Sequence, residues 1–358
     1  MFGDKPLREL GKRGGWAAAA LLLVLGPGAE AAAEGRPLPA LSVRGVNYYP
    51  RETPWGGMWT KTPADVWKKD LALAASLQAN TVRTFLSFSP SLEQAGLLQR
   101  DGAPTPAYLE KLEAFLAAAG QNGLRAILCF DFDPKSLASP AGGERWRRAV
   151  ATVVGGHCGD ARVLAWDLMN EPDDDAKWGD GTRAYLRDAL ALVRSIDTNH
   201  LTTVGMTWRI DRIRAAGLPD LIQYHEYCPK EILFEKGAAR VRQTVASQRR
   251  AGGGRPVLIG EFGMSTSRDP AHGAEAALAG KMSEAPGTEA EQERLYGIVL
   301  EAAEQEGAAG AVAWCLYDYP IGNPNESHFG LVRSDGTLKP AAALLKKTFM
   351  RWKGAAAP

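Results

Sequence analysis

Two glutamates stand where apolar, strand-like segments give way to loop residues. Glu171 lies in the motif Asp-Leu-Met-Asn-Glu-Pro, and Glu261 lies in Val-Leu-Ile-Gly-Glu-Phe-Gly. A glycosidic bond is broken when one carboxylic acid protonates the leaving oxygen while a second carboxylate attacks or stabilises the anomeric carbon from the other face. For either glutamate alone, a solvated loop residue is the simpler interpretation. As a pair with suitable neighbours, they predict hydrolysis of a sugar acetal.

Polar residues that suit the same chemistry lie close to these glutamates or end another strand-like segment. Asn170 directly precedes Glu171, and an amide there can hydrogen-bond a sugar hydroxyl. Strand alternation puts His225 and Tyr227 on one face. The Tyr227 hydroxyl near Glu261 would orient that carboxylate, and His225 would hydrogen-bond the substrate or the acid/base. Without the glutamates, a structural His and Tyr pair would be the better explanation of the two residues.

Arg83 is a charged residue inside an otherwise apolar segment. A buried arginine needs a carboxylate partner. If Arg83 points toward Glu261, it keeps that carboxylate ionised and lowers its pKa, which leaves Glu171 as the group with a raised pKa. The alternative is a structural ion pair between Arg83 and an aspartate.

Aromatic residues are candidates for stacking against the apolar faces of sugar rings, although each is also explained by packing. Trp314, in the last strand-like segment, is expected at the floor of the site or under the bound sugar. Further candidate platforms lie in or beside the loops that follow strand-like segments, and together they suggest a cleft. These are Trp55, Trp59, Trp178, Trp208, Tyr317 and Tyr319.

Short strand-like segments alternate with longer segments of helical period, which predicts a parallel sheet with crossover helices. Eight such units without a Pro/Ser-rich linker favour an α/β fold, a single (β/α)8 TIM barrel, over a doubly wound open sheet. Glu171 and Glu261 follow the fourth and seventh segments, so both would face one mouth of the barrel. The segments are 41–49, 80–87, 124–132, 162–169, 200–206, 221–227, 256–262 and 309–317.

Composition restricts the partners of the protein. The chain has 358 residues, 45% of them hydrophobic, which is enough for a large core, and its net charge is only +1. Length alone would allow two domains, whereas the strand count predicts one catalytic barrel at 34–358. The low net charge gives no general attraction to nucleic acid or anionic lipid. A neutral partner is therefore expected, which a carbohydrate satisfies. A monomer is the default expectation for a secreted barrel of this kind.

Residues 1–33 have the pattern of a signal peptide. Lys5 and Arg8 belong to a basic start, residues 16–25 form a short apolar run, and small residues follow at 29–33. The pattern predicts a secreted or periplasmic protein without stable membrane association after cleavage. An N-terminal membrane anchor is the alternative, although the apolar run is short for a bilayer.

The four cysteines are widely scattered and lack the close pairing of a zinc site. They are Cys129, Cys158, Cys228 and Cys315. Export permits a disulfide without requiring one, so no bridge is assigned.

Taken together, these residues resemble clan A glycoside hydrolases, and most of all glycoside hydrolase family 5, the cellulase and mannanase family. The resemblance runs from about Val43 to Ala341. It implies that Glu171 is the acid/base and Glu261 the nucleophile of a retaining double displacement on β-glucan or β-mannan, without metal or organic cofactor. The supporting residues of the family match Arg83, Asn170, His225, Tyr227 and Trp314.

One departure concerns the end of the third segment, where family 5 members commonly carry a histidine. Here the stretch contains Asp131 and Asp133 instead, so one of them is expected to contact the sugar. The opening residues 44–50 also resemble galactosidase and glucuronidase relatives of the clan. An exo-acting β-glycosidase therefore remains an alternative, as does a non-catalytic carbohydrate-binding barrel.

Overall fold

The computed structural model describes residues 38–137, 139–268, 286–319 and 324–355. The predicted signal peptide and the alternative membrane anchor at 1–33 lie outside the described residues. Within the described ranges, no helix has the length and apolar character needed to cross a bilayer. The four cysteines all lie in these ranges and are free thiols.

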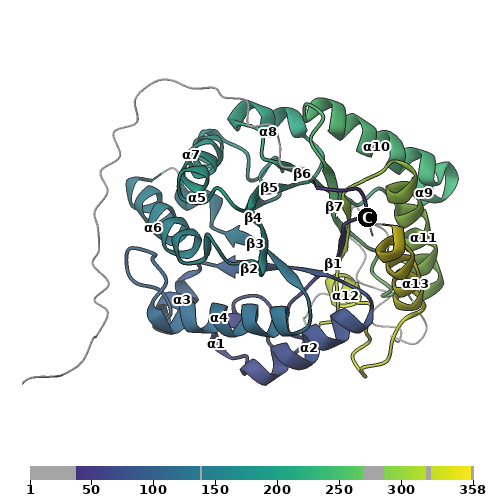
Figure 1. The fold of residues 1–358 in the computed structure, drawn as a ribbon, viewed down its shortest axis with the longest axis horizontal. Helices are drawn as coiled ribbons and strands as arrows, with labels where there is room; N and C mark the ends of the chain where they lie inside the picture. The colour runs from purple at the N-terminus through teal and green to yellow at the C-terminus, as the bar shows by residue number, and fades with distance from the viewer. Residues whose placement is uncertain (1–37, 138, 269–285, 320–323, 356–358) are drawn as a thin grey trace, which may run out of the picture. The chain divides into compact units, whose positions relative to one another are not determined.

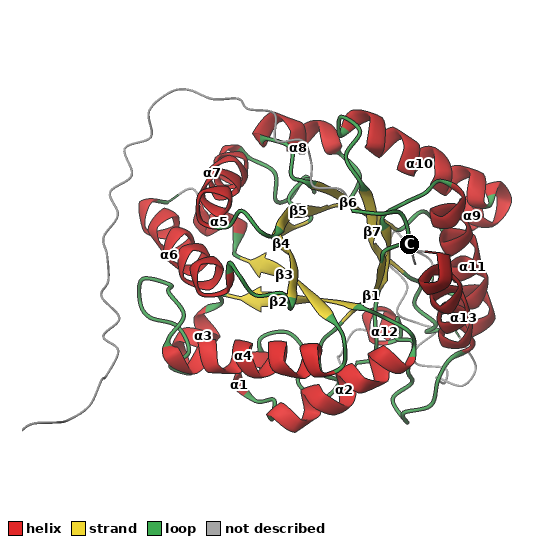
Figure 2. Ribbon diagram, viewed as in Figure 1, coloured by secondary structure: helices red, strands yellow, loops and turns green. Residues whose placement is uncertain are grey.

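Eight parallel strands close into a barrel in chain order, and the helices surround it (Figures 1 and 2). This arrangement confirms the predicted (β/α)8 TIM barrel, and every strand lies within, or one residue beyond, a predicted segment. The strands are β1 (Val43–Asn47), β2 (Thr81–Ser87), β3 (Arg125–Asp131), β4 (Val163–Asn170), β5 (Leu201–Met206), β6 (Leu221–Glu226), β7 (Val257–Phe262) and β8 (Gly310–Ala313).

The helices cover the outside of the strands with the apolar faces that the sequence predicts, such as Trp67, Leu71 and Ala74 on α2. The helix before β8, α11, begins with a capping box in which Thr288 and Glu291 satisfy each other's backbone N–H groups. The helices are α1 (Gly57–Thr60), α2 (Ala64–Ser76), α3 (Pro90–Gln94), α4 (Pro106–Gln121), α5 (Pro134–Leu137), α6 (Pro140–His157), α7 (Asp180–Ile196), α8 (Ile210–Ala216), α9 (Lys230–Lys236), α10 (Ala238–Ala251), α11 (Glu289–Gln305), α12 (Pro324–Ser327) and α13 (Pro340–Ala355).

The interior of the barrel changes character along the strands. Near the strand N-termini, apolar side chains such as Val43, Ile127 and Leu221 form a buried cluster. Two or more residues further along, the buried side chains are polar, as at Asn47 on β1 and Gln223 on β6. Because strand side chains alternate between faces, this change places a polar layer at the C-terminal mouth.

Candidate active site

Arg83 is the centre of a buried polar network at the mouth of the barrel. Its Nε donates to Asp167 Oδ2 at 2.8 Å, and its Nη1 donates to Glu261 Oε1 at 2.5 Å. The same guanidinium donates to the amide oxygens of Asn47, at 2.9 Å, and Asn170, at 2.8 Å. Burial alone would lower the pKa of Arg83, but the carboxylates raise it above its usual value. The sequence analysis left two partners open for Arg83, an aspartate or Glu261. In the structure Arg83 pairs with both Asp167 and Glu261.

The two glutamates are fixed by different contacts. Glu261, near the end of β7, accepts from Arg83 at Oε1 and from the Tyr227 hydroxyl at Oε2, at 3.1 Å. Glu171 follows β4 with a φ of +47°, a left-handed conformation that is strained for a non-glycine residue. Its backbone N–H donates to the Gly205 carbonyl at 2.6 Å. This turn directs Glu171 away from the strand and toward the mouth.

His225 lies between the two carboxylates. Its Nδ1 is 2.8 Å from Glu171 Oε1, and its Nε2 is 3.7 Å from Glu261 Oε1. One oxygen of Glu171 and one of Glu261 lie within 4.8 Å of each other. His225 therefore contacts the predicted acid/base, as the sequence suggested, and Tyr227 contacts the other glutamate.

The sequence analysis predicted a raised pKa for Glu171, and this prediction is wrong: the pKa is lowered. Burial acts to raise the pKa of Glu171, but the hydrogen bond and charge of His225, with smaller effects of Lys177 and Arg83, lower it to about 2. A sugar that displaces water from Glu171 would favour the neutral carboxylic acid, because desolvation disfavours the charged form.

Besides Asn47, three residues of this network had no role in the sequence analysis. Asp167 Oδ1 accepts from the Gly205 N–H, and its Oδ2 accepts from Gln223 Nε2 as well as from Arg83. A Cβ at Gly205 would lie 2.9 Å from nitrogens of Arg83, Gln223 and His225. Only glycine leaves room for these side chains at that point of β5. The signal in the sequence was a polar residue inside an apolar strand, which applies to both Asp167 and Gln223.

Three of the proposed aromatic platforms remain available to a ligand. Trp314 and Trp55 line one pocket beside Asn170, and Trp55 is 40% exposed while stacking on Tyr49 at 5.3 Å between ring centroids. Trp208, on the loop after β5, is 62% exposed. These positions agree with a role in stacking, which stays a prediction.

Two other aromatic residues are corrected by the structure. Trp59 belongs to α1, is fully buried, and donates its Nε1–H to the Phe85 carbonyl at 2.9 Å. Tyr317 is buried, and its hydroxyl donates to Asp70 of α2 at 2.8 Å. Both side chains pack into the protein, so neither can stack on a sugar.

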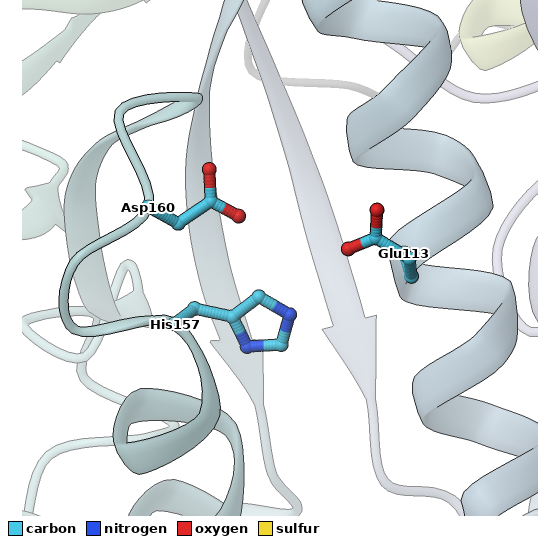
Figure 3. Close-up of side chains that lie close together, drawn as sticks. All are labelled: Glu113, His157 and Asp160. Carbon is cyan, nitrogen blue, oxygen red and sulfur yellow. The ribbon is translucent and has the colours of Figure 1, made fainter.

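A second group of a histidine and two carboxylates lies at the other end of the barrel. Glu113 of α4 faces His157, the last residue of α6, and Asp160 from the connection between α6 and β4 (Figure 3). Arg162 donates to both oxygens of Glu113 and to both oxygens of Asp160, at 2.7–3.1 Å. Because Arg162 already pairs with both carboxylates, a structural ion-pair network explains this group. At the mouth of the barrel, Arg83 likewise pairs with two carboxylates, those of Asp167 and Glu261.

The sequence of this barrel matches a known protein family. The family model described as Cellulase (glycosyl hydrolase family 5) matches residues 34–318. The chain belongs to glycosyl hydrolase family 5. The resemblance drawn from Glu171, Glu261 and their neighbours is thereby confirmed.

The relatives of this family 5 chain include plant proteins and bacterial structures. It is 28% identical over 208 residues to the putative mannan endo-1,4-β-mannosidase 5 of Oryza sativa subsp. japonica, a match over 47% of this chain and 40% of that protein. The exo-β-1,4-mannosidase Op5Man5 of Opitutaceae bacterium strain TAV5 shares its fold with a TM-score of 0.69 at 23% identity, over 89% of this chain and 61% of that one. A GH5_18 protein of Bifidobacterium longum subsp. longum aligns with a TM-score of 0.69 at 17% identity, over 88% and 80%. The chain thus spans less than two thirds of the first two relatives.

The Arg83 network should be essential for the stability of this family 5 barrel. Arg83→Met leaves Asp167 and Glu261 as buried carboxylates without their cation, which should lower the free energy of unfolding by about 3–5 kcal/mol. Arg187→Met is a matched control, because the Arg187 pair with Asp188 is largely exposed and should contribute under about 1 kcal/mol. Denaturant unfolding of both variants measures this, and equal midpoints would contradict the assigned importance of Arg83.

Proposed function

We propose that the protein is an exported, retaining β-glycosidase that cleaves β-1,4-linked mannan or a related β-linked polysaccharide. The observation that carries the proposal is the approach of the two carboxylates, whose oxygens lie within 4.8 Å. Retaining glycosidases hold their carboxyl groups roughly 5–5.5 Å apart, whereas inverting enzymes need about 6.5–9.5 Å to admit a water. The short separation supports double displacement.

In the first step, Glu261 attacks the anomeric carbon and forms a covalent glycosyl ester, while the bond to the leaving oxygen breaks. Glu171 gives its proton to that oxygen. Arg83 and Tyr227 donate to Glu261, which keeps it ionised and aims it before attack. These two donors also stabilise the carboxylate when it leaves again in the second step.

In the second step, Glu171 removes a proton from water, and the resulting hydroxide attacks the anomeric carbon and releases Glu261. Net retention of configuration follows from two inversions. His225, at 2.8 Å from Glu171, is placed to shift the proton of that carboxyl between the two steps.

The substrate class is supported by family membership and by the similarity of about half of this chain to the putative mannan endo-1,4-β-mannosidase 5 of Oryza sativa. Export rests on the basic start and the apolar run within residues 1–33. The reaction as proposed uses side chains alone and assigns no step to a metal or an organic cofactor.

The test is reducing-sugar release by the purified mature protein from β-mannan, cellulose, mixed-linkage glucan and xylan, with aryl β-glycosides in parallel. We expect release from β-mannan that disappears in Glu261→Gln. Cleavage of aryl glycosides alone would favour the exo-acting alternative. Binding of a polysaccharide without turnover of any substrate would contradict the proposal and favour the non-catalytic barrel.

A further inference from the structure

A pocket of about 240 Å³ opens beside Asn170, the residue that precedes the proposed acid/base. Aromatic rings form much of its wall, including Trp55, Trp314 and Phe132. Two charged side chains also line it, Asp131 and Lys177. Aromatic faces with a few polar groups are the usual composition of a sugar-binding pocket, because the C–H face stacks while the hydroxyls hydrogen-bond.

Asp131 and Asp133 are the two acidic residues that the sequence offered at the end of β3, and the structure separates their roles. Asp133 Oδ1 accepts from the Lys135 N–H at 3.0 Å, so it stabilises the first turn of α5. No described protein group donates to the Asp131 carboxylate. Nearby protein atoms nevertheless desolvate it, which raises its pKa, with the charge of Lys177 acting in the opposite direction. Asp131 is therefore a carboxylate with unused acceptor capacity in the pocket.

Lys177 supplies the complementary donor. Its Nζ donates to the Asn170 carbonyl at 3.1 Å, which fixes the ammonium beside the proposed acid/base. An ammonium has three N–H donors, so two remain for a ligand. Lys177 lies close enough to Asp131 and Glu171 for its charge to act on both carboxyls.

We propose that Asp131 and Lys177 bind the hydroxyl groups of a neutral sugar unit in this pocket and so determine specificity. A carboxylate can accept from two adjacent hydroxyls, and an ammonium can donate to a hydroxyl or ring oxygen. The two opposite charges nearly cancel, which suits an uncharged pyranose. Because the Asp131 charge offsets that of Lys177, the pocket has no excess positive charge to favour a sugar acid over a neutral sugar. The inference rests on the proposed function and names the substrate property that the same site selects.

The experiment compares Asp131→Asn with Asp133→Asn, a control that keeps an acceptor for the Lys135 N–H. Both are made in the wild-type and Glu261→Gln backgrounds. Binding of β-1,4-mannotriose and cellotriose to the Glu261→Gln proteins is measured by calorimetry, and KM and kcat are measured in the active proteins. Asp131→Asn should weaken binding roughly tenfold and raise KM with a smaller change in kcat, because charge-assisted hydrogen bonds to the sugar are lost. Lys177→Met should act in the same direction.

The Asp133→Asn control separates a role in sugar binding from a structural effect. Asp133→Asn should bind like its parent, and the thermal midpoints of the Asp131 and Asp133 variants should agree, which excludes a merely structural effect. Equal binding by the two variants, with turnover intact in the parent, would overturn the role of Asp131 and leave the proposed function standing. Preference for a uronate-containing trisaccharide over mannotriose would also overturn it. If the wild type cleaves no β-linked saccharide, the proposed function fails and the inference fails with it.

Discussion

Replacement of Glu261 by glutamine is expected to lower kcat by at least about 10⁴-fold, because removal of a nucleophile eliminates the covalent route. The amide has nearly the same size as the carboxylate; its oxygen can still accept from Arg83, while its NH2 group can donate to the Tyr227 hydroxyl oxygen. The fold should therefore persist, as judged by an unchanged far-UV circular dichroism spectrum. Steady-state hydrolysis of an aryl β-glycoside measures the effect.

Glu226 provides the matched control for this variant. It is the last residue of β6, is also a buried glutamate at a strand end, and accepts from the Cys228 N–H at 3.3 Å. Burial raises the pKa of Glu226, with the charge of Arg240 acting in the opposite direction, and glutamine keeps an oxygen that can accept from the Cys228 N–H. Glu226→Gln should retain activity. Comparable losses in the Glu226 and Glu261 variants would point to a general effect of neutralising buried carboxyls, and the assigned nucleophile would be wrong.

Replacement of Glu171 by alanine should have an effect that depends on the leaving group. For substrates with a poorly acidic leaving alcohol, the loss of proton donation should lower kcat/KM by about 10²–10⁴-fold. A dinitrophenyl glycoside needs little protonation of its leaving oxygen, so formation of the glycosyl ester should be nearly unaffected. Hydrolysis of that ester still needs a base, and a burst of dinitrophenol should therefore precede slow turnover.

Pre-steady-state measurements on the two substrate types distinguish this role from a structural one. A uniform loss on both substrates, without a burst, would show that Glu171 does more than transfer protons. An added small anion such as azide can replace water without base assistance. It should therefore accelerate release of the ester in Glu171→Ala and leave the wild type unchanged.

The barrel and the positions of the two glutamates could be predicted from the sequence, because both depend on local patterns. Apolar runs alternating with helical stripes define eight β/α units, and residues at strand C-termini of such a barrel share one mouth. Arg83 was informative for a similar reason, since a charge inside an apolar strand demands a partner. Its partners lie on three other strands, β1, β4 and β7.

Long-range contacts account for what the sequence could not predict. The pKa of Glu171 depends on His225, a residue 54 positions away that faces it only after the barrel closes. Trp59 and Tyr317 are aromatic residues that could stack on a sugar. In the fold, however, Trp59 is buried on α1, and the Tyr317 hydroxyl is bound to Asp70, so both side chains point into the protein. Lys177 lies in a polar loop with no regular pattern, and its place in the site is seen only in the fold, where it binds the Asn170 carbonyl and lines the pocket.

The most direct test of the central claim is capture of the glycosyl ester. A 2-deoxy-2-fluoro-β-mannoside with a dinitrophenyl leaving group slows both steps but favours the first, so the ester should accumulate. Mass spectrometry of the intact protein should show one added fluorosugar, and peptide mapping should locate it on Glu261. A label on another residue, or turnover to product of inverted configuration without any label, would contradict a retaining mechanism with Glu261 as nucleophile.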